Sequence, residues 1–160
     1  MAKRSAGILL YRRRGPEIEL LLVHPGGPFW AKKDLGAWSI PKGEYAPQED
    51  AFAVARRELE EETGAAVAGD VLPLGDVVQR GGKIVSAWAL EGDFDPATLR
   101  SNLFEMEWPP RSGRRQSFPE VDRAQWFSPD EAAQKILPAQ GAFITRLLQA
   151  LNETQLRRAR

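Results

Sequence analysis

The fold of this chain is decided by residues 43–64, GEYAPQEDAFAVARRELEEETG, where four glutamates lie close together just before the final glycine. Pro47 suits the first position of a helix, and the acidic residues directly after it suit the first turn. Gly64 suits the position just past the helix, because glycine readily adopts the left-handed backbone conformation common there. We therefore expect a helix from Pro47 to Glu62, flanked on both sides by loops.

The predicted helix concentrates carboxylates on one face. At about 100° per residue, Glu58, Glu61 and Glu62 project from one side, whereas Glu60 points away. Like charges at this spacing repel by about 0.2–0.5 kcal/mol per pair, and acids near a helix C-terminus oppose its dipole. A divalent cation removes the conflict, because Mg²⁺ and Mn²⁺ prefer oxygen ligands. The neighbouring face is apolar and should pack on a core: Ala51, Phe52, Ala55 and Leu59.

For the glutamates alone, an exposed acidic helix end, neutralised by the two preceding arginines, is the competing interpretation. The spacing upstream decides between the two, because it reads Gly43, five residues, Glu49, seven residues, then RELEEETG at 57–64. This pattern resembles the Nudix box, G-x5-E-x7-R-E-U-x-E-E-x-G-U, in which U is a bulky aliphatic residue. Every fixed charged or glycine position matches. The single departure is Ala65, where the family usually has isoleucine, leucine or valine.

The resemblance implies metal-dependent hydrolysis of a pyrophosphate bond by a metal-activated water. The groups that would hold Mg²⁺ or Mn²⁺ are the carboxylates of Glu58, Glu61 and Glu62 and the backbone carbonyl of Gly43. Arg57 would orient these acids by pairing with Glu49. No covalent nucleophile is required, which suits a chain with no cysteine and a single histidine.

The resemblance also implies the fold, an α/β/α sandwich with a mixed β-sheet in which the box forms loop–helix–loop, and we expect a single domain over 1–160. The residue patterns agree with a mixed α/β domain. Two predicted hairpins pair 5–13 with 18–24, and 71–79 with 83–90 across a Gly-Gly turn. Three short strands are predicted: one at Trp38, one that includes Glu105 and Glu107, and one at 122–127, with a basic loop at 109–119 between the last two. A short helix capped by Ser128 follows. The final helix begins at about Gly141 and carries an apolar stripe of Phe143, Ile144, Leu147, Leu148 and Leu151.

Composition limits the classes of function. The 160 residues carry 22 Lys plus Arg against 22 Asp plus Glu, so a general polyanion binder is not expected and no specific nucleic acid partner is predicted. Without cysteine there is no thiolate metal site, and the lone His24, which we interpret as structural, argues against a serine–histidine–aspartate triad. No apolar run reaches the length of a membrane helix. A cytoplasmic protein acting on a small nucleotide is expected, with its oligomeric state open.

Motifs around the box suggest a subgroup. The run WSIPKG at 38–43 and the glutamate Glu120, six residues before Trp126, look like the dinucleoside-polyphosphate (diadenosine tetraphosphate) hydrolases. The function implied is hydrolysis of nucleoside or dinucleoside polyphosphates. The alternatives are hydrolysis of ADP-ribose or nucleotide sugars, hydrolysis of diphosphoinositols, removal of pyrophosphate from RNA 5′ ends, and a nucleotide-sensing module without catalysis.

Several residues outside the box are candidates for the site, each against the plainer interpretation of an exposed or packed side chain. Glu120 is a candidate ligand or general base, and Glu105 and Glu107 could also approach the metal. Lys42 could meet a phosphate as a point charge. The basic loop could grip a polyphosphate through Arg111, Arg114 and Arg115. A nucleobase could stack on Tyr45, Phe29 or Trp30.

Overall fold

The computed structural model describes residues 2–64 and 69–158, and Ala65 lies outside this part. The centre is a six-stranded mixed sheet in the order β4-β5-β1-β2-β8, with β3 paired to β1 as well. Its strands are β1 (Arg4–Arg14), β2 (Glu17–Pro25), β3 (Lys42–Tyr45), β4 (Leu72–Val78), β5 (Ile84–Glu91) and β8 (Val121–Phe127). Strands β6 (Leu103–Glu107) and β7 (Arg115–Pro119) form a separate two-stranded sheet.

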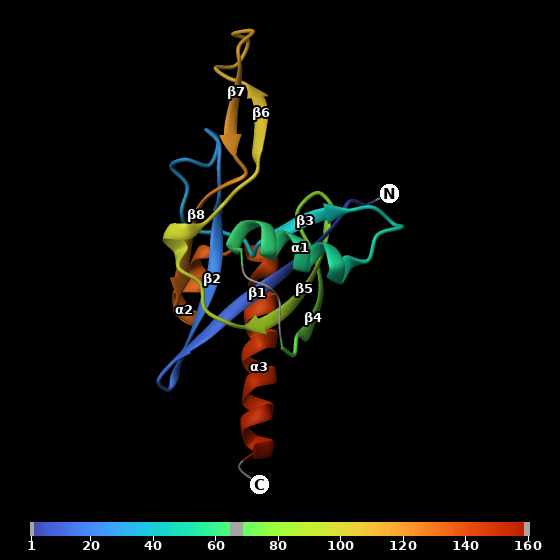
Figure 1. Ribbon diagram of the computed structural model, residues 1–160, viewed down its shortest axis with the longest axis vertical. Helices are drawn as coiled ribbons and strands as arrows, with labels where there is room; N and C mark the ends of the chain where they lie inside the picture. The colour runs from blue at the N-terminus through green and yellow to red at the C-terminus, as the bar shows by residue number, and fades with distance from the viewer. Residues whose placement is uncertain (1, 65–68, 159–160) are drawn as a thin grey trace.

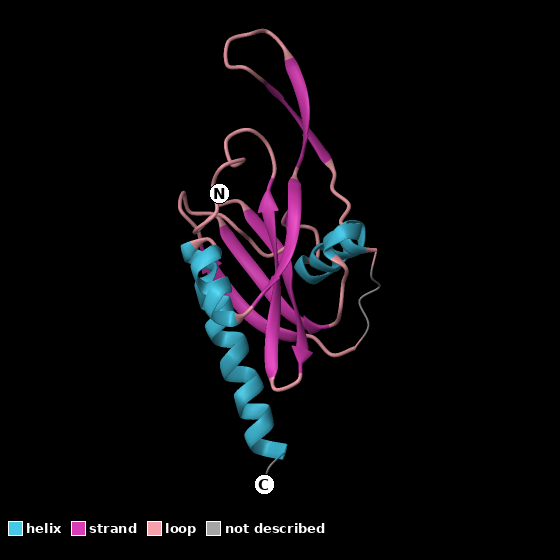
Figure 2. Cartoon of the chain, turned by 90° about the vertical axis from the view of Figure 1, so that its left-hand side faces the viewer, coloured by secondary structure: helices cyan, strands magenta, loops and turns pink. Residues whose placement is uncertain are grey.

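Helices cover both faces of the central sheet. Helix α1 (Ala51–Thr63) lies on one side and α3 (Gly141–Arg158) on the other, as Figure 2 shows. The remaining elements are α2 (Pro129–Lys135), which shares a core with α3, and two 3₁₀ turns at Pro96–Thr98 and Pro138–Gln140. The predicted α/β/α sandwich with a mixed sheet is confirmed.

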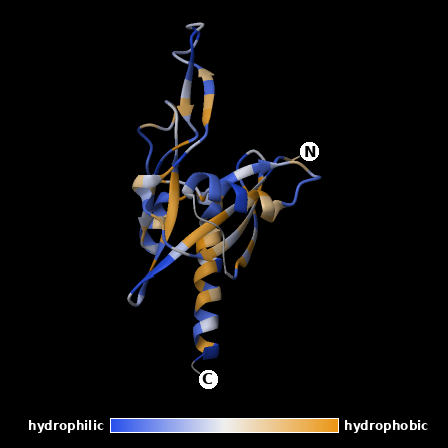
Figure 3. Cartoon of the chain, viewed as in Figure 1, coloured by the Kyte–Doolittle hydropathy of each residue, from blue (hydrophilic) through white to orange (hydrophobic). Residues whose placement is uncertain are grey.

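Strand β1 is buried on both faces and organises the core. Its odd and even residues point to opposite layers, so Ile8 and Leu10 pack towards α1 while Leu9 and Tyr11 pack towards α3. Figure 3 shows hydrophobic colours along the middle of β1 and β2 and hydrophilic colours at the tip of their hairpin. The stripe predicted on α3 is confirmed, because Phe143, Ile144 and Leu147 are buried and Leu148 and Leu151 pack beside them.

The sheet forks at β1. On one edge β5 runs parallel to it from Arg4 to Tyr11. On the other edge the last residues of β1 pair with β2, whereas Arg4–Gly7 pair with β3. At the fork Gly7 is crowded, since a Cβ atom there would lie 2.3 Å from the carbonyl oxygen of Pro41. This close approach fixes the entry of the chain into β3, which carries the first residues of the box.

Helix α1 begins at Ala51, so the predicted start at Pro47 is wrong. Asp50 is the N-cap, because its side chain accepts a hydrogen bond from the Ala53 N–H at 2.9 Å. The Glu49 carboxylate accepts from the Ala46 N–H at 2.9 Å, which closes the preceding residues into a turn. The predicted end is confirmed to within one residue.

Two other elements differ from expectation. Trp38 makes an isolated bridge to Ile136, and the regular strand begins only at Lys42. The predicted basic loop is half strand, because β7 pairs with β6 in a hairpin that projects from the body (Figure 1). The exposed residues of β7 lack the apolar alternation that identifies a strand. None of the helices in the described ranges has the length and apolar character to cross a membrane.

Candidate active site

The fork in the sheet brings the box glycine against helix α1. Gly43 on β3 lies so close to Glu58 that a Cβ atom at Gly43 would stand 2.5 Å from the Glu58 carboxyl carbon and from its Oε1. The carboxylate of Glu58 therefore rests on the backbone of β3. Burial, followed by the charge of Glu61, raises the pKa of Glu58.

Glu62 is the buried carboxylate of the site. It is only 5% exposed, and its Oε2 has no hydrogen-bond partner among the described residues. Burial raises the pKa of Glu62 to about 8, with the negative charges of Glu58 and Glu120 adding to the effect. A buried carboxylate without a partner is costly, so this position favours a ligand that supplies positive charge.

Glu120 faces these acids from the opposite side, in the link between β7 and β8. Its backbone is fixed twice, because its N–H donates to the Asn102 carbonyl at 2.8 Å and its carbonyl accepts from the Gly26 N–H at 2.9 Å. Gly26 permits this approach, since a Cβ atom there would lie 1.9 Å from the Pro119 carbonyl oxygen. The structure thus brings the predicted Glu120 to the box residues.

Lys42 is the basic group of the site. Burial and the neighbouring ammonium of Lys83 lower the pKa of Lys42 to about 8. Lys83 is itself paired with Glu44 at 3.1 Å. The Lys42 ammonium is therefore easier to deprotonate than that of an exposed lysine. A phosphate close to it would stabilise its charged form.

Two adjoining pockets are built on these groups. The acidic pocket, about 350 Å³, is lined by Ser5, Lys42, Gly43, Glu44, Glu58, Asn102 and Glu120. The apolar pocket, about 310 Å³, is lined by the charged residues Lys42, Glu62 and Glu120 and by other residues that include Val23, Trp30, Ala37, Ile40, Gln79, Val121 and Leu137. Because Lys42 and Glu120 belong to both pockets, one ligand can place charged groups in the first and a ring in the second.

The donor atoms suit a divalent cation. Glu58, Glu62 and Glu120 offer carboxylate oxygens, the atoms that such a cation prefers. Two buried polar atoms, Glu62 Oε2 and Ser5 Oγ, have no hydrogen-bond partner among the described residues. Within the described residues, no three acidic or histidine side chains already form a complete metal site. Glu61 is exposed beside the acidic pocket, with its Oε2 3.5 Å from Asn102 Nδ2 and its Oε1 3.9 Å from Arg57 Nε.

Gly43→Ala tests whether the carboxylate on β3 is essential. The added methyl group must displace the flexible Glu58 side chain, so we expect kcat to fall by about 10- to 100-fold, the loss typical of a misplaced ligand. The fold should persist, because only a side chain has to move. The control is Gly141→Ala, because a Cβ atom at Gly141 meets nothing within 4 Å, and this variant should retain full activity. Gly81 is unsuitable as a control because its φ of 89° would strain an alanine. Full activity of Gly43→Ala would contradict the assignment.

Of the remaining predicted residues, Arg57 lies beside the acids of α1, whereas Tyr45 lies outside both pockets. Arg57 lies 3.9 Å from both Glu49 and Glu61, which places it as expected between the acids. Tyr45 packs against the core beneath α1 and lines neither pocket. Its predicted stacking on a base stays a prediction.

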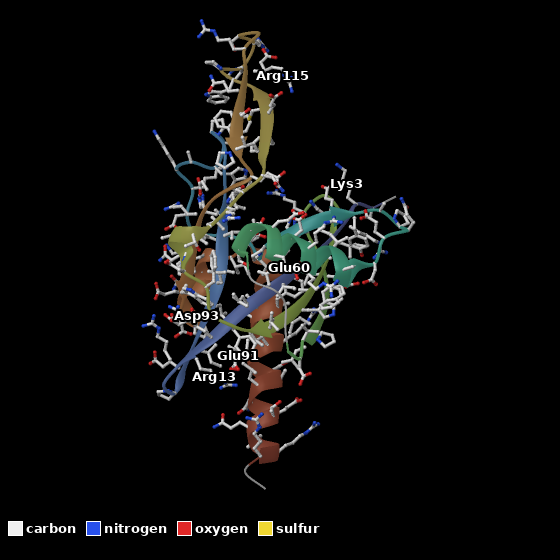
Figure 4. All side chains as sticks on the ribbon, in the orientation of Figure 1. Lys3, Arg13, Glu60, Glu91, Asp93 and Arg115 are labelled. Carbon is white, nitrogen blue, oxygen red and sulfur yellow. The ribbon has the colours of Figure 1, made fainter. Side chains whose placement is uncertain are left out.

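The residues of the hairpin lie away from α1. Figure 4 shows Arg115 near the hairpin tip, far from Glu60 on α1. Arg115 lies 3.7 Å from Glu105, and Glu107 accepts a hydrogen bond from the Gly113 N–H, so neither acid is directed at the box. A grip on polyphosphate by Arg114 and Arg115 stays a prediction that requires a long substrate.

Sequence reasoning missed four residues that the fold brings to the pockets. Ser5 and Asn102 line the acidic pocket, Gln79 lines the apolar pocket, and the buried Gln140 binds Gln79. Each comes from a segment far from the box, so no local spacing marks it. His24, which we interpreted as structural, is buried and hydrogen-bonded to Asp122 and to the Lys33 carbonyl.

Comparisons with known proteins bear on the family and the fold of this chain. A family model described as the NUDIX domain matches residues 1–147. Among solved structures, the chain is similar to a C. elegans Ap4A hydrolase in a binary complex, with a TM-score of 0.63 and 21% identity over 93% of this chain and 98% of that chain. At that identity the likeness is one of fold.

Two curated proteins are similar in sequence. An octanoyltransferase of Myxococcus xanthus is 32% identical over 138 residues, which cover 86% of this chain and 34% of that protein. An RNA pyrophosphohydrolase of Erythrobacter litoralis is 37% identical over 78 residues, which cover 49% of this chain and 40% of that protein. In both cases the match spans less than half of the relative's length.

Proposed function

This chain belongs to the Nudix family, and on that basis we propose that it hydrolyses a pyrophosphate bond in nucleoside or dinucleoside polyphosphates. The observation that carries the proposal is the meeting of Glu58, Glu62, Lys42 and Glu120 around two joined pockets. The acidic pocket suits a cation and phosphates, whereas the apolar pocket suits a base. A nucleotide polyphosphate has both parts.

In the proposed mechanism the side chains of the chain divide the work. Nudix enzymes generally need a divalent cation such as Mg²⁺, which when bound neutralises phosphate charge and makes a water more acidic. Glu58, Glu61 and Glu62 would hold that cation, and Lys42 would donate to a phosphate oxygen. The Glu120 carboxylate accepts the proton of the attacking water. The water oxygen bonds to phosphorus, and the anhydride P–O bond breaks to give two phosphate-bearing products.

For the substrate, we propose that long polyphosphates are preferred. Lys42 lines both pockets, and Arg114 and Arg115 lie on the projecting hairpin of β6 and β7. A chain of four phosphates offers more oxygens to such widely spaced cations than a two-phosphate compound does. Each extra charge-assisted contact contributes roughly 1.5–3 kcal/mol before desolvation.

A substrate panel tests both parts of the proposal. With Mg²⁺ or Mn²⁺, kcat/KM for diadenosine tetraphosphate should exceed that for ADP-ribose by at least about tenfold, the effect of one such contact. The double variant Arg114→Gln, Arg115→Gln should reduce this ratio more than it reduces activity on ADP-ribose. The products are separated by chromatography, and excess chelator should abolish turnover of every compound.

The matched control is Arg157→Gln, Arg158→Gln, which removes the same charge from the last turn of α3. It should leave the ratio unchanged. A higher kcat/KM for ADP-ribose would overturn the subgroup proposal, and faster pyrophosphate release from RNA 5′ ends would replace it. A hairpin double variant that slows all substrates equally would show that the arginines do not act on the polyphosphate.

A further inference from the structure

A buried glutamine sets the hydrogen-bonding direction at the wall of the apolar pocket. Gln140 is fully buried, and its Oε1 accepts from the backbone N–H of Ile40 at 3.0 Å. A backbone N–H can only donate, so this contact settles which end of the Gln140 amide is the oxygen. The Nε2 group of Gln140 must therefore be the donor in its remaining bonds, to Ser39 Oγ at 3.0 Å and to Gln79 at 2.7 Å.

The orientation of Gln140 fixes that of Gln79. Because Gln140 Nε2 donates, the group of Gln79 that receives this bond is its Oε1. The Gln79 Nε2 group then remains as a donor, since within the described residues the side chain of Gln79 is bonded only through its Oε1. Gln79 is half-buried and lines the apolar pocket, so a ligand in that pocket can accept a hydrogen bond from its NH₂ group.

The rest of the pocket suits a flat aromatic ring. Its walls are apolar over Val23, Ile40 and Leu137, and Trp30 adds an aromatic surface. The Ser39 hydroxyl is already bonded to the Ile40 carbonyl and to Gln140, and the Trp30 indole N–H can donate but not accept. The carboxylates that line this pocket serve the cation and the proton. A base in this pocket therefore meets neutral side-chain donors, of which Gln79 is held in place by Gln140.

We infer that the apolar pocket selects a base that presents a carbonyl oxygen, so that guanine and hypoxanthine bind in preference to adenine. The inference rests on the proposed nucleotide hydrolysis and names the base of its substrate. The O6 and N7 atoms of a 6-oxopurine both accept hydrogen bonds. Adenine also has the N7 acceptor, but its 6-amino group directs N–H towards a donor placed there, so the NH₂ group of Gln79 meets two acceptors on a 6-oxopurine and one on adenine.

The test compares three substrates that differ only in the base: diguanosine, diinosine and diadenosine tetraphosphate. In the wild-type protein, kcat/KM for the guanosine and inosine compounds should exceed that for the adenosine compound by about 5- to 100-fold. The inosine compound separates the carbonyl from the 2-amino group of guanine. If diadenosine tetraphosphate is hydrolysed as well as or better than the other two, the inference is wrong.

Gln79→Glu reverses the polarity of the contact without changing its shape. One carboxylate oxygen still accepts from Gln140, and the other now accepts where the amide donated. The guanine-to-adenine ratio should fall by at least about tenfold, even if the added charge slows all three substrates. Gln155→Glu adds the same charge on the exposed end of α3 and should keep the wild-type ratio. An unchanged ratio in Gln79→Glu would overturn the role of Gln79.

Binding separates this inference from the proposed function. If none of the tetraphosphates is hydrolysed, the proposed function fails, but calorimetric titration with GMP and AMP still measures the base preference. Tighter binding of GMP, lost in Gln79→Glu, would support the base contact on its own. Equal binding of GMP and AMP would overturn it.

Discussion

Replacing Glu62 with glutamine is expected to lower kcat by more than about 100-fold while the fold is kept. Residues that merely support a metal ligand typically contribute 10- to 100-fold to activity, and Glu62 is placed as a ligand itself. Its buried Oε2 has no partner among the described residues, so the amide removes the charge without breaking a protein contact. Initial rates at saturating Mg²⁺, with circular dichroism as a check of folding, measure the loss.

The neighbouring glutamates on α1 provide the comparison. Glu61→Gln should also reduce kcat strongly, because this exposed side chain lies beside the acidic pocket and completes the proposed ligand set. Glu60→Gln removes the same charge from the other side of the helix and should change kcat little. Equal losses at the three positions would mean that the acids act only through total charge.

In chelator, the same Glu62→Gln variant is expected to be more stable than the wild-type protein at pH 8. The folded-state pKa of Glu62 is about 8, above the ordinary value of 4.5. A group with a raised pKa stabilises the fold fully below its unfolded value and loses that contribution as pH rises through the folded value. The wild-type free energy of unfolding should therefore fall between about pH 4.5 and pH 8.

The size of this effect follows from the shift. At about 1.4 kcal/mol per pKa unit, burying the charge costs on the order of 4 kcal/mol by pH 8. The amide that replaces this carboxylate is buried without a partner among the described residues, which costs about 1–3 kcal/mol, so we expect a net gain of about 2 kcal/mol. Urea unfolding at pH 5 and pH 8 in chelator measures it, with Glu61→Gln as the exposed control. A variant less stable than wild type at pH 8 would show that Glu62 is already compensated without a cation.

Lys42 sets the upper limit of the pH range in which the metal-free protein loses stability. Its folded-state pKa of about 8 lies below the ordinary 10.5, so its contribution to stability is lost as pH falls and regained as pH rises above 8. The two groups oppose each other on either side of pH 8. The metal-free wild-type protein should consequently be least stable near that pH, and comparisons are best made between pH 5 and pH 8.

The family, the fold class and the acids of α1 could be predicted because they depend on local spacing. The distances from Gly43 to Glu49 and Glu58 are fixed along the chain, and the structure brings Gly43 and Glu58 into contact. The start of α1 was predicted four residues too early, at Pro47 and not at Ala51, because proline suits a first turn but Asp50 supplies the capping bond. Both features are local, and the side-chain bond outweighs the backbone preference.

The rest of the site could not be predicted, because it depends on contacts between distant segments. Gln79 and Gln140 are 61 residues apart, and neither has a partner nearby in the sequence that would mark it. Ser5 lies on β1, whose apolar pattern indicates only a buried strand. Glu120 was recognised through its resemblance to a subgroup, whereas its position follows from bonds to Asn102 and Gly26.

The separate hairpin of β6 and β7 can change in length during evolution without disturbing the central sheet. The hairpin shares no strand with the six-stranded sheet, and the bonds that fix Glu120 lie at its base. Doubling the length of a loop costs only about 0.6 kcal/mol in closure entropy. Insertions or deletions beyond Phe104 and Phe118 can therefore accumulate without loss of the carboxylate centre. A lineage could change the outer reach of its substrate there while the reaction itself is inherited intact.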